Sequence, residues 1–191
     1  MKKMKAKWQS VTLRAVLTAA CLGMIGWIFS NSLQTAEAST EQSAGFMDTL
    51  QRFFAWLAPN SFIATATGKD YDRLHTIVRV LAHFCEFALL GALLVWCYRS
   101  YTKKRIWLLL PLACIVLVPI TDELLQFFTD GRAWEITDVF TDVSGGICGG
   151  SFALFTIWLT ETIVRKRKAK KEKKGEENGA GQLGSSVDKI Q

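Results

Sequence analysis

The chain has 191 residues, is 50% hydrophobic and carries a net charge of +6 at pH 7. Its length would suit one water-soluble domain, but the distribution of its apolar residues excludes that class. These residues are concentrated in four long blocks, each close to the roughly 20 residues that cross a bilayer core of about 30 Å. The sequence therefore predicts an all-α integral membrane protein with about four transmembrane helices.

The limits of the apolar blocks predict where the spans lie. We expect spans at about 11–29, 76–97, 106–128 and 136–164, so that residues 11–164 form one four-helix membrane domain. Lys and Arg residues precede the first span, separate the second from the third and follow the fourth. Because positively charged flanks stay in the cytoplasm, we predict an N-in, C-in topology with a cytoplasmic N-terminus at residues 1–10.

The first apolar block also resembles a secretory signal, because lysines precede it and the sequence "TAEAS" follows it. This pattern places a cleavage site after Ala38. The apolar run is longer than the core of most signal peptides, which favours a span that is retained. Both alternatives stay open from the sequence alone.

Residues 30–75 are predicted to form an outer loop that contains a short amphipathic helix at 45–58. On a helix, Phe46, Leu50 and Phe53 fall within about 60° of one another and form an apolar stripe. The stripe suits a helix that lies on the outer membrane surface. A helix packed against the spans would show the same pattern.

The tail, residues 165–191, begins with the basic run "RKRKAKKEKK" and continues with a Gly- and Ser-rich stretch. It has almost nothing apolar to bury, so we predict a disordered cytoplasmic tail. Basic runs next to a span are typical of topology signals and of contact with anionic lipid head groups. We therefore expect membrane lipids, and no nucleic acid, as its partners.

Several ionisable residues fall inside the predicted spans, where each charge costs about 2.5–3.5 kcal/mol on insertion scales. In the second span, Arg79, His83 and Glu86 are spaced i, i+4 and i+7 and share one helical face. In the third span, Asp122 and Gln126 share a face. Such costly residues are retained for function or for structure.

In the fourth span, Asp138 and Asp142 lie one turn apart and are followed on the same face by Gly145. Glycines on a helix face allow close approach to neighbouring helices. With spans that alternate in direction, all of these polar groups fall at one depth, in the outer leaflet. We call this set the polar cluster, and its members are Arg79, His83, Glu86, Asp122, Glu123, Gln126, Arg132, Asp138 and Asp142.

Two further interpretations of the polar cluster compete with a functional site. Arg79 and Arg132 could neutralise the carboxylates in a buried salt-bridge network that fixes helix packing. Alternatively, a divalent metal could be the cofactor, although no sequential ligand spacing supports such a site. The candidate metal ligands are His83, Glu86, Asp122 and Asp142.

Three segments carry a family resemblance: "FSNS" at the end of the first span, "RVLAHFCEFALLG" in the second, and "DELLQFFTDGRAWEITDVFTDVSGG" from the third span into the fourth. Together they resemble the VanZ-like membrane protein family. The resemblance implies a multi-pass protein of the cell membrane of Gram-positive bacteria. The family is named for an accessory component of glycopeptide resistance, so the resemblance also implies low-level teicoplanin resistance. The resemblance leaves open whether the protein has a catalytic activity.

Two functional hypotheses follow from the residues and the resemblance. In the first, the polar cluster binds a lipid-linked cell-wall precursor or a lipoglycopeptide and so alters antibiotic access. In the second, the protein is a membrane enzyme acting on a lipid carrier or lipid phosphate, with His83 or Glu86 as general base and an arginine holding the phosphate. The sequence leaves open whether the protein is an enzyme and what its oligomeric state is.

Overall fold

The computed structural model describes residues 2–187, and no strand occurs among them. Four helical segments are long and apolar enough to cross a membrane, at Val11–Ser32, Lys69–Tyr101, Arg105–Phe127 and Ile136–Arg167. Many of their large apolar side chains are exposed, as expected where a surface faces lipid. The prediction of an all-α membrane protein with four spans is confirmed.

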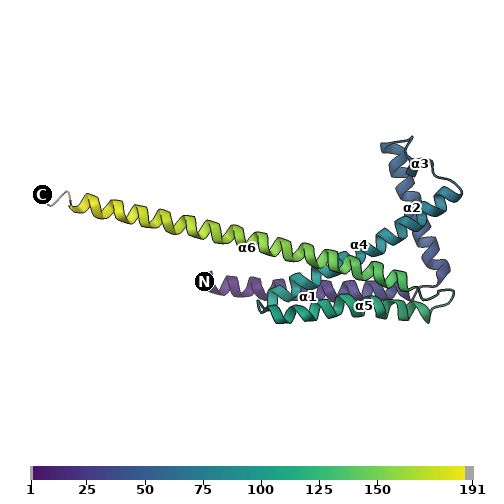
Figure 1. The fold of residues 1–191 in the computed structure, drawn as a ribbon, viewed down its shortest axis with the longest axis horizontal. Helices are drawn as coiled ribbons and strands as arrows, with labels where there is room; N and C mark the ends of the chain where they lie inside the picture. Colours follow the sequence, from purple (N-terminus) through teal and green to yellow (C-terminus); the bar gives the residue numbers. More distant parts are fainter. Residues whose placement is uncertain (1, 188–191) are drawn as a thin grey trace. The chain divides into compact units, whose positions relative to one another are not determined.

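Helices α1 (Lys2–Ser32), α4 (Lys69–Tyr101) and α5 (Leu109–Phe127) lie side by side and contact one another (Figure 1). A short 3₁₀ helix, η1 (Arg105–Leu108), leads into α5. Helix α6 (Ile136–Val187) follows. Its first turns belong to the same compact unit as the other helices, and its remainder from Leu154 belongs to a second unit.

The core between α1, α4 and α5 is small and purely apolar. It consists of the buried side chains Ile28, Phe87, Leu90 and Val118, with half-buried residues such as Met24 around them. At about 25 cal/mol per Å² of apolar surface removed from water, such packing would stabilise a soluble protein. Inside a bilayer the surrounding lipid is equally apolar, so close packing and polar contacts between helices must supply the specificity.

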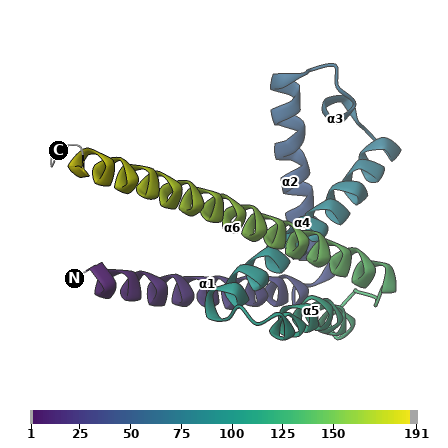
Figure 2. The same ribbon diagram turned by 60° about the vertical axis from the view of Figure 1, so that its left-hand side comes forward.

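Helix α2 (Ala36–Leu57) runs across the bundle rather than along it, and α3 (Phe62–Thr65) lies between α2 and the first turns of α4 (Figure 2). Met47 of α2 is fully buried with Ala66 and Leu74, whereas Trp56 is 79% exposed. One face of α2 therefore packs on α3 and α4, and another is free to contact lipid. Packing of this helix on its neighbours is thus observed, whereas its contact with the outer membrane surface stays a prediction.

Three boundaries differ from those expected. Helix α2 begins at Ala36 rather than at 45, because the Thr35 hydroxyl caps it by accepting a hydrogen bond from the Ala38 N–H at 3.4 Å. Helix α4 begins at Lys69 rather than at 76, and acids in its first turn suit the positive end of the helix dipole.

The third difference concerns the tail, residues 165–191, for which we predicted disorder. Helix α6 continues through it to Val187, and residues 188–191 lie outside the described part of the chain. Lys, Glu and Arg, which dominate the first half of the tail, are good helix formers, so low apolar content does not exclude a helix there.

Candidate functional site

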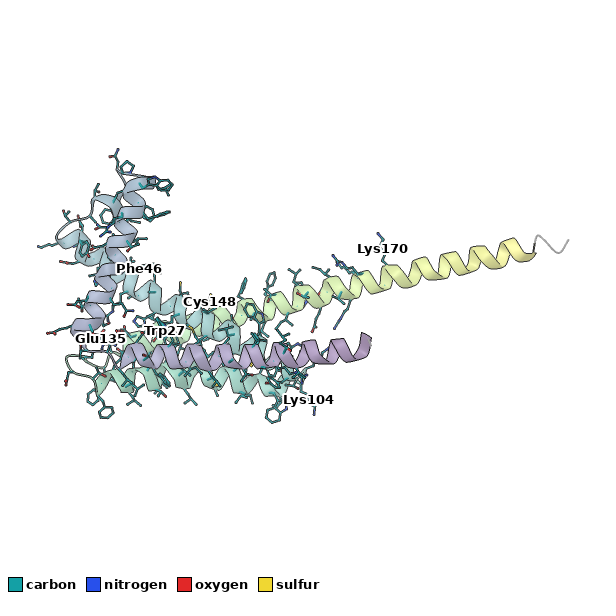
Figure 3. All side chains as sticks on the ribbon, turned by 180° about the vertical axis from the view of Figure 1, so that it is seen from behind. Trp27, Phe46, Lys104, Glu135, Cys148 and Lys170 are labelled. Atoms are coloured by element: carbon teal, nitrogen blue, oxygen red, sulfur yellow. The ribbon has the colours of Figure 1, made fainter. Side chains whose placement is uncertain are left out.

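The structure brings the polar cluster together at one end of the helices. Helix α1 ends there, α4 begins, α5 ends and α6 begins, so alternating chain direction places polar segments far apart in sequence at the same level. Figure 3 shows this end at the label Glu135, with Lys104 at the opposite end of the bundle. We refer to this region as the polar end.

Asp122 is the centre of a hydrogen-bonded group between α1 and α5. The Ser32 hydroxyl donates to its Oδ1, and the Gln126 amide, one turn further along α5, donates to its Oδ2 at 2.9 Å. The Thr129 hydroxyl lies 3.2 Å from the Ser32 carbonyl oxygen and fixes the end of α1 further. Asp122 is only 1% exposed, and a neutral donor of the protein binds each of its two oxygens.

Two other buried or half-buried acids are also held by neutral donors. The Glu135 backbone N–H donates to Glu123 Oε2 at 3.0 Å, which places a carboxyl group at the N-terminus of α6. The Asn31 amide lies 3.5 Å from Glu86 Oε1. Among the described residues, Oε1 of Glu123 is buried and has no hydrogen-bond partner.

One ion pair joins α4 to α6 at the polar end. Arg79 Nη2 lies 3.6 Å from Asp138 Oδ2, and the two side chains are 52% and 27% exposed. A pair of this length and exposure contributes about 0–1 kcal/mol. Since Asp122, Glu123 and Glu86 bind neutral donors, the described residues do not form the buried salt-bridge network considered as an alternative.

Asp142 lies one turn below Asp138 and is 1% exposed. Its Oδ1 has no hydrogen-bond partner in the part of the chain that the structure describes. A gap of about 10 Å³ separates it from Arg79 and His83 of α4. Asp142 is thus the least satisfied carboxyl group of the polar cluster.

Close packing of α6 on α4 sets the positions of Asp138 and Asp142. A Cβ atom at Gly145 would overlap the carbonyl oxygen of Phe84, and one at Gly149 would overlap that of Ala88. Only glycine permits backbones to approach so closely. The prediction that glycines on this face allow a close helix contact is confirmed.

Two adjacent cavities, of about 250 and 240 Å³, lie at the polar end. The first is bounded by α1, α2 and α4, and the second by α2, α4 and the loop between α5 and α6. None of the side chains common to both is acidic. These shared residues are Ser39, Ser43, His75, Arg79, His83 and Arg132.

Three of the shared residues were not anticipated from the sequence. Ser39 and Ser43 come from the first turns of α2, which we expected to be loop, and His75 precedes the expected start of the second span. A signal was nevertheless present, because His75, Arg79 and His83 are each four residues apart and so share one face of α4.

Arg132 extends from the α5–α6 loop and lines both cavities. Burial lowers the pKa of its guanidinium from the usual value, and the positive charge of Arg79 lowers it further. Charges on Asp122, Glu123 and Asp138 oppose that effect. Arginine stays protonated despite such shifts, so the polar end holds two neighbouring guanidinium charges.

The candidate metal ligands do not converge. In the part of the chain that the structure describes, no three His, Cys, Asp or Glu side chains are arranged so that they could hold a metal ion. His83 and Glu86 line the first cavity with Asp122, but Asp142 does not line it. The geometry gives the proposed metal site no support.

Fold and site together define a four-span, all-α membrane protein with a polar, partly basic cavity at one end of its helices. A family model described as VanZ/LLP1 matches residues 17–159, which include every member of the polar cluster. The chain belongs to the VanZ/LLP1 family. Comparisons with curated proteins and with solved structures find no match.

Proposed function

We propose that this VanZ-like protein acts at the cell envelope by binding the head group of a lipid-linked cell-wall component or lipoglycopeptide, and so raises tolerance to teicoplanin. The observation that carries the proposal is the pair of cavities at the polar end, each lined by charged or polar side chains from several helices. Concave sites with a few convergent polar groups are the usual form of ligand sites.

The location of the cavities supports a ligand that is itself part of the membrane. They adjoin α2, whose exposed Phe46, Phe53 and Trp56 suit contact with the bilayer interface. A lipid held there would reach its site from the membrane plane. The Lys and Arg residues of the other connections favour an outer position for this end, which would suit a site for wall precursors or glycopeptides.

The test is expression of the full chain in a glycopeptide-susceptible Gram-positive host, with teicoplanin and vancomycin tolerance measured against an empty vector. We expect increased tolerance to teicoplanin, which carries a lipid tail, and a smaller effect on vancomycin. Unchanged tolerance to both drugs at normal membrane abundance would overturn the proposal.

A matched pair of variants connects the phenotype to the cavities. Arg132→Gln removes a charge from the walls of both cavities, whereas Arg73→Gln removes a charge from an arginine that is 78% exposed and pairs with Asp70. We expect Arg132→Gln to lose the tolerance and Arg73→Gln to keep it, at equal abundance by immunoblot. Loss in both variants would indicate a general effect of net charge.

The second candidate is an enzyme acting on a lipid carrier or lipid phosphate. It is favoured by His83, which lines both cavities one turn from Arg79 and could act as a general base beside a bound head group. Purified protein should then convert a lipid-linked substrate, with or without added divalent metal, and His83→Gln should abolish turnover while binding persists. Binding without turnover in the wild type would favour the first candidate.

A further inference from the structure

We propose that the two cavities form one site for a lipid phosphate, with the phosphate held between Arg79 and Arg132 and the lipid chain leaving along the apolar wall of the first cavity. This inference rests on the proposed function, because it names the chemical class of the head group. In this site, basic side chains would bind the phosphate, and an apolar wall would contact the lipid chain.

The walls shared by the two cavities carry hydrogen-bond donors that suit an anion. Arg79 and Arg132 provide two guanidinium groups, and planar guanidinium donors match the oxygens of a phosphate. Ser39 and Ser43 add hydroxyl groups from α2. Each carboxylate that lines these cavities lines only one of them, Glu86 and Asp122 the first and Glu135 and Asp138 the second, so the shared region is the most basic part of the site.

His75 adds an aromatic ring with polar nitrogens to the walls of both cavities. Its Nε2 is buried and has no hydrogen-bond partner among the described residues. The ring lies parallel to that of Tyr71, with centroids 6.2 Å apart and planes 4° from parallel. Buried polar atoms are nearly always paired, so this nitrogen is a polar group in the cavity walls without a partner from the described chain.

The lining of the first cavity favours a lipid phosphate over a free phosphate ion. Besides the basic groups, its walls contain the apolar side chains of Ile28, Phe46, Val78 and Ala82. An inorganic anion would not bury this apolar surface, whereas a hydrocarbon chain attached to the phosphate would cover it and remove it from water.

Asp138 occupies the place of a counterion that a ligand can replace. It pairs with Arg79 over 3.6 Å in a half-exposed position and lines the second cavity, so it competes with any anion for that guanidinium. If Arg79 served only to brace α4 against α6, loss of Asp138 would weaken the site. In a phosphate site, loss of Asp138 removes a competitor and strengthens binding.

The experiment measures binding of three probes to the purified full chain in phosphatidylcholine nanodiscs. The probes are farnesyl phosphate, farnesol and inorganic phosphate, and the dissociation constants are obtained by calorimetry. We expect farnesyl phosphate to bind at least tenfold more tightly than either of the others. Equal binding of farnesyl phosphate and farnesol would overturn the proposal, and so would binding of inorganic phosphate that is as tight as that of farnesyl phosphate.

Variants then identify the groups that hold the phosphate. Arg79→Gln and Arg132→Gln should each weaken farnesyl phosphate binding at least tenfold, Arg73→Gln should leave it unchanged, and Asp138→Asn should tighten it. Lys replacements at the two cavity arginines keep the charge and should restore part of the affinity, which covers the case in which a Gln variant does not fold. Affinity that is unchanged in both Gln variants, or lowered in Asp138→Asn, would overturn the assignment.

The outcome also separates this inference from the proposed function. A protein that raises teicoplanin tolerance but does not discriminate farnesyl phosphate from farnesol has the proposed function with another head group, and the lipid phosphate assignment fails. A protein that binds farnesyl phosphate through these arginines without changing tolerance supports the site and overturns the envelope-protection role.

Discussion

The hydroxyl of Ser32 donates a hydrogen bond to the carboxyl group of Asp122 and so joins the last turn of α1 to α5. Both side chains are buried, at 2% and 1% exposure. The same hydroxyl also lies 3.1 Å from the Ile28 carbonyl oxygen. Polar contacts between spans add specificity that apolar packing cannot supply inside lipid.

Replacement of Ser32 by Ala should lower the free energy of unfolding by about 1–2 kcal/mol, because Oδ1 of Asp122 loses its donor in a buried site. The measurement is equilibrium unfolding in mixed micelles. Ser30→Ala is the matched control, since Ser30 is exposed on the same helix and should have no effect. Equal stability of Ser32→Ala and the wild type would show that the hydrogen bond contributes nothing.

Alanine at Gly145 or Gly149 should force α6 away from α4, because the added methyl group meets the backbone of Phe84 or Ala88. Overpacking of this kind costs about 1–3 kcal/mol. Thermal unfolding of detergent-purified protein would measure the loss. Gly23→Ala, where nothing lies within 4 Å of the new Cβ, should be neutral or stabilising, and a comparable loss there would contradict the packing argument.

Gln51 holds the segment after α2 in place, because its amide donates to the carbonyl oxygens of Ile63 at 3.2 Å and Ala66 at 3.0 Å. Gln51→Glu replaces both donors with acceptors and should free that segment. We expect faster backbone hydrogen exchange at residues 61–68, with little change in the spans. The exposed neighbour Arg52 provides the control variant Arg52→Gln, and equally fast exchange in both would refute the role of Gln51.

The bond after Ala38 should remain intact in the membrane-bound protein. Ala36 and Ala38 lie in the capped first turn of α2, and proteolysis favours exposed loop tips. Helix α1 is also bound to α4, because Arg14 Nε donates a hydrogen bond to the Ser100 carbonyl oxygen at 2.9 Å. This contact suits a retained span rather than a cleaved signal. Intact-mass measurement should give the mass of a polypeptide that includes the residues on both sides of this bond. A mature protein that begins at Ser39 would disprove the prediction.

The sequence was sufficient to predict the four spans and to select the residues of the polar cluster. A helix rises 1.5 Å and turns 100° per residue, so the spacing of Arg79, His83 and Glu86 determines that they share a face. Alternating direction of successive spans then places the start of α4, the end of α5 and the start of α6 at one level. Both inferences depend only on local helix geometry.

The partners of the acids could not be predicted in this way. Ser32 and Asp122 are 90 positions apart, and nothing in either segment indicates that a hydroxyl rather than Arg132 would satisfy this carboxyl group. Sequence periodicity describes positions around one helix axis, but it does not describe the rotation of one helix relative to the next. Packing of side chains between helices decides that rotation.

The cavities depend on the same tertiary information. Sequence alone determined a four-span helical protein with a cluster of charged groups at one depth. Only the tertiary structure placed Ser39 and Ser43 of α2 opposite His75 and Arg79 of α4, because α2 crosses the bundle and is held there by the burial of Met47. A segment that packs across the spans takes its position from contacts with residues distant in sequence. These contacts cannot be predicted from local helix geometry.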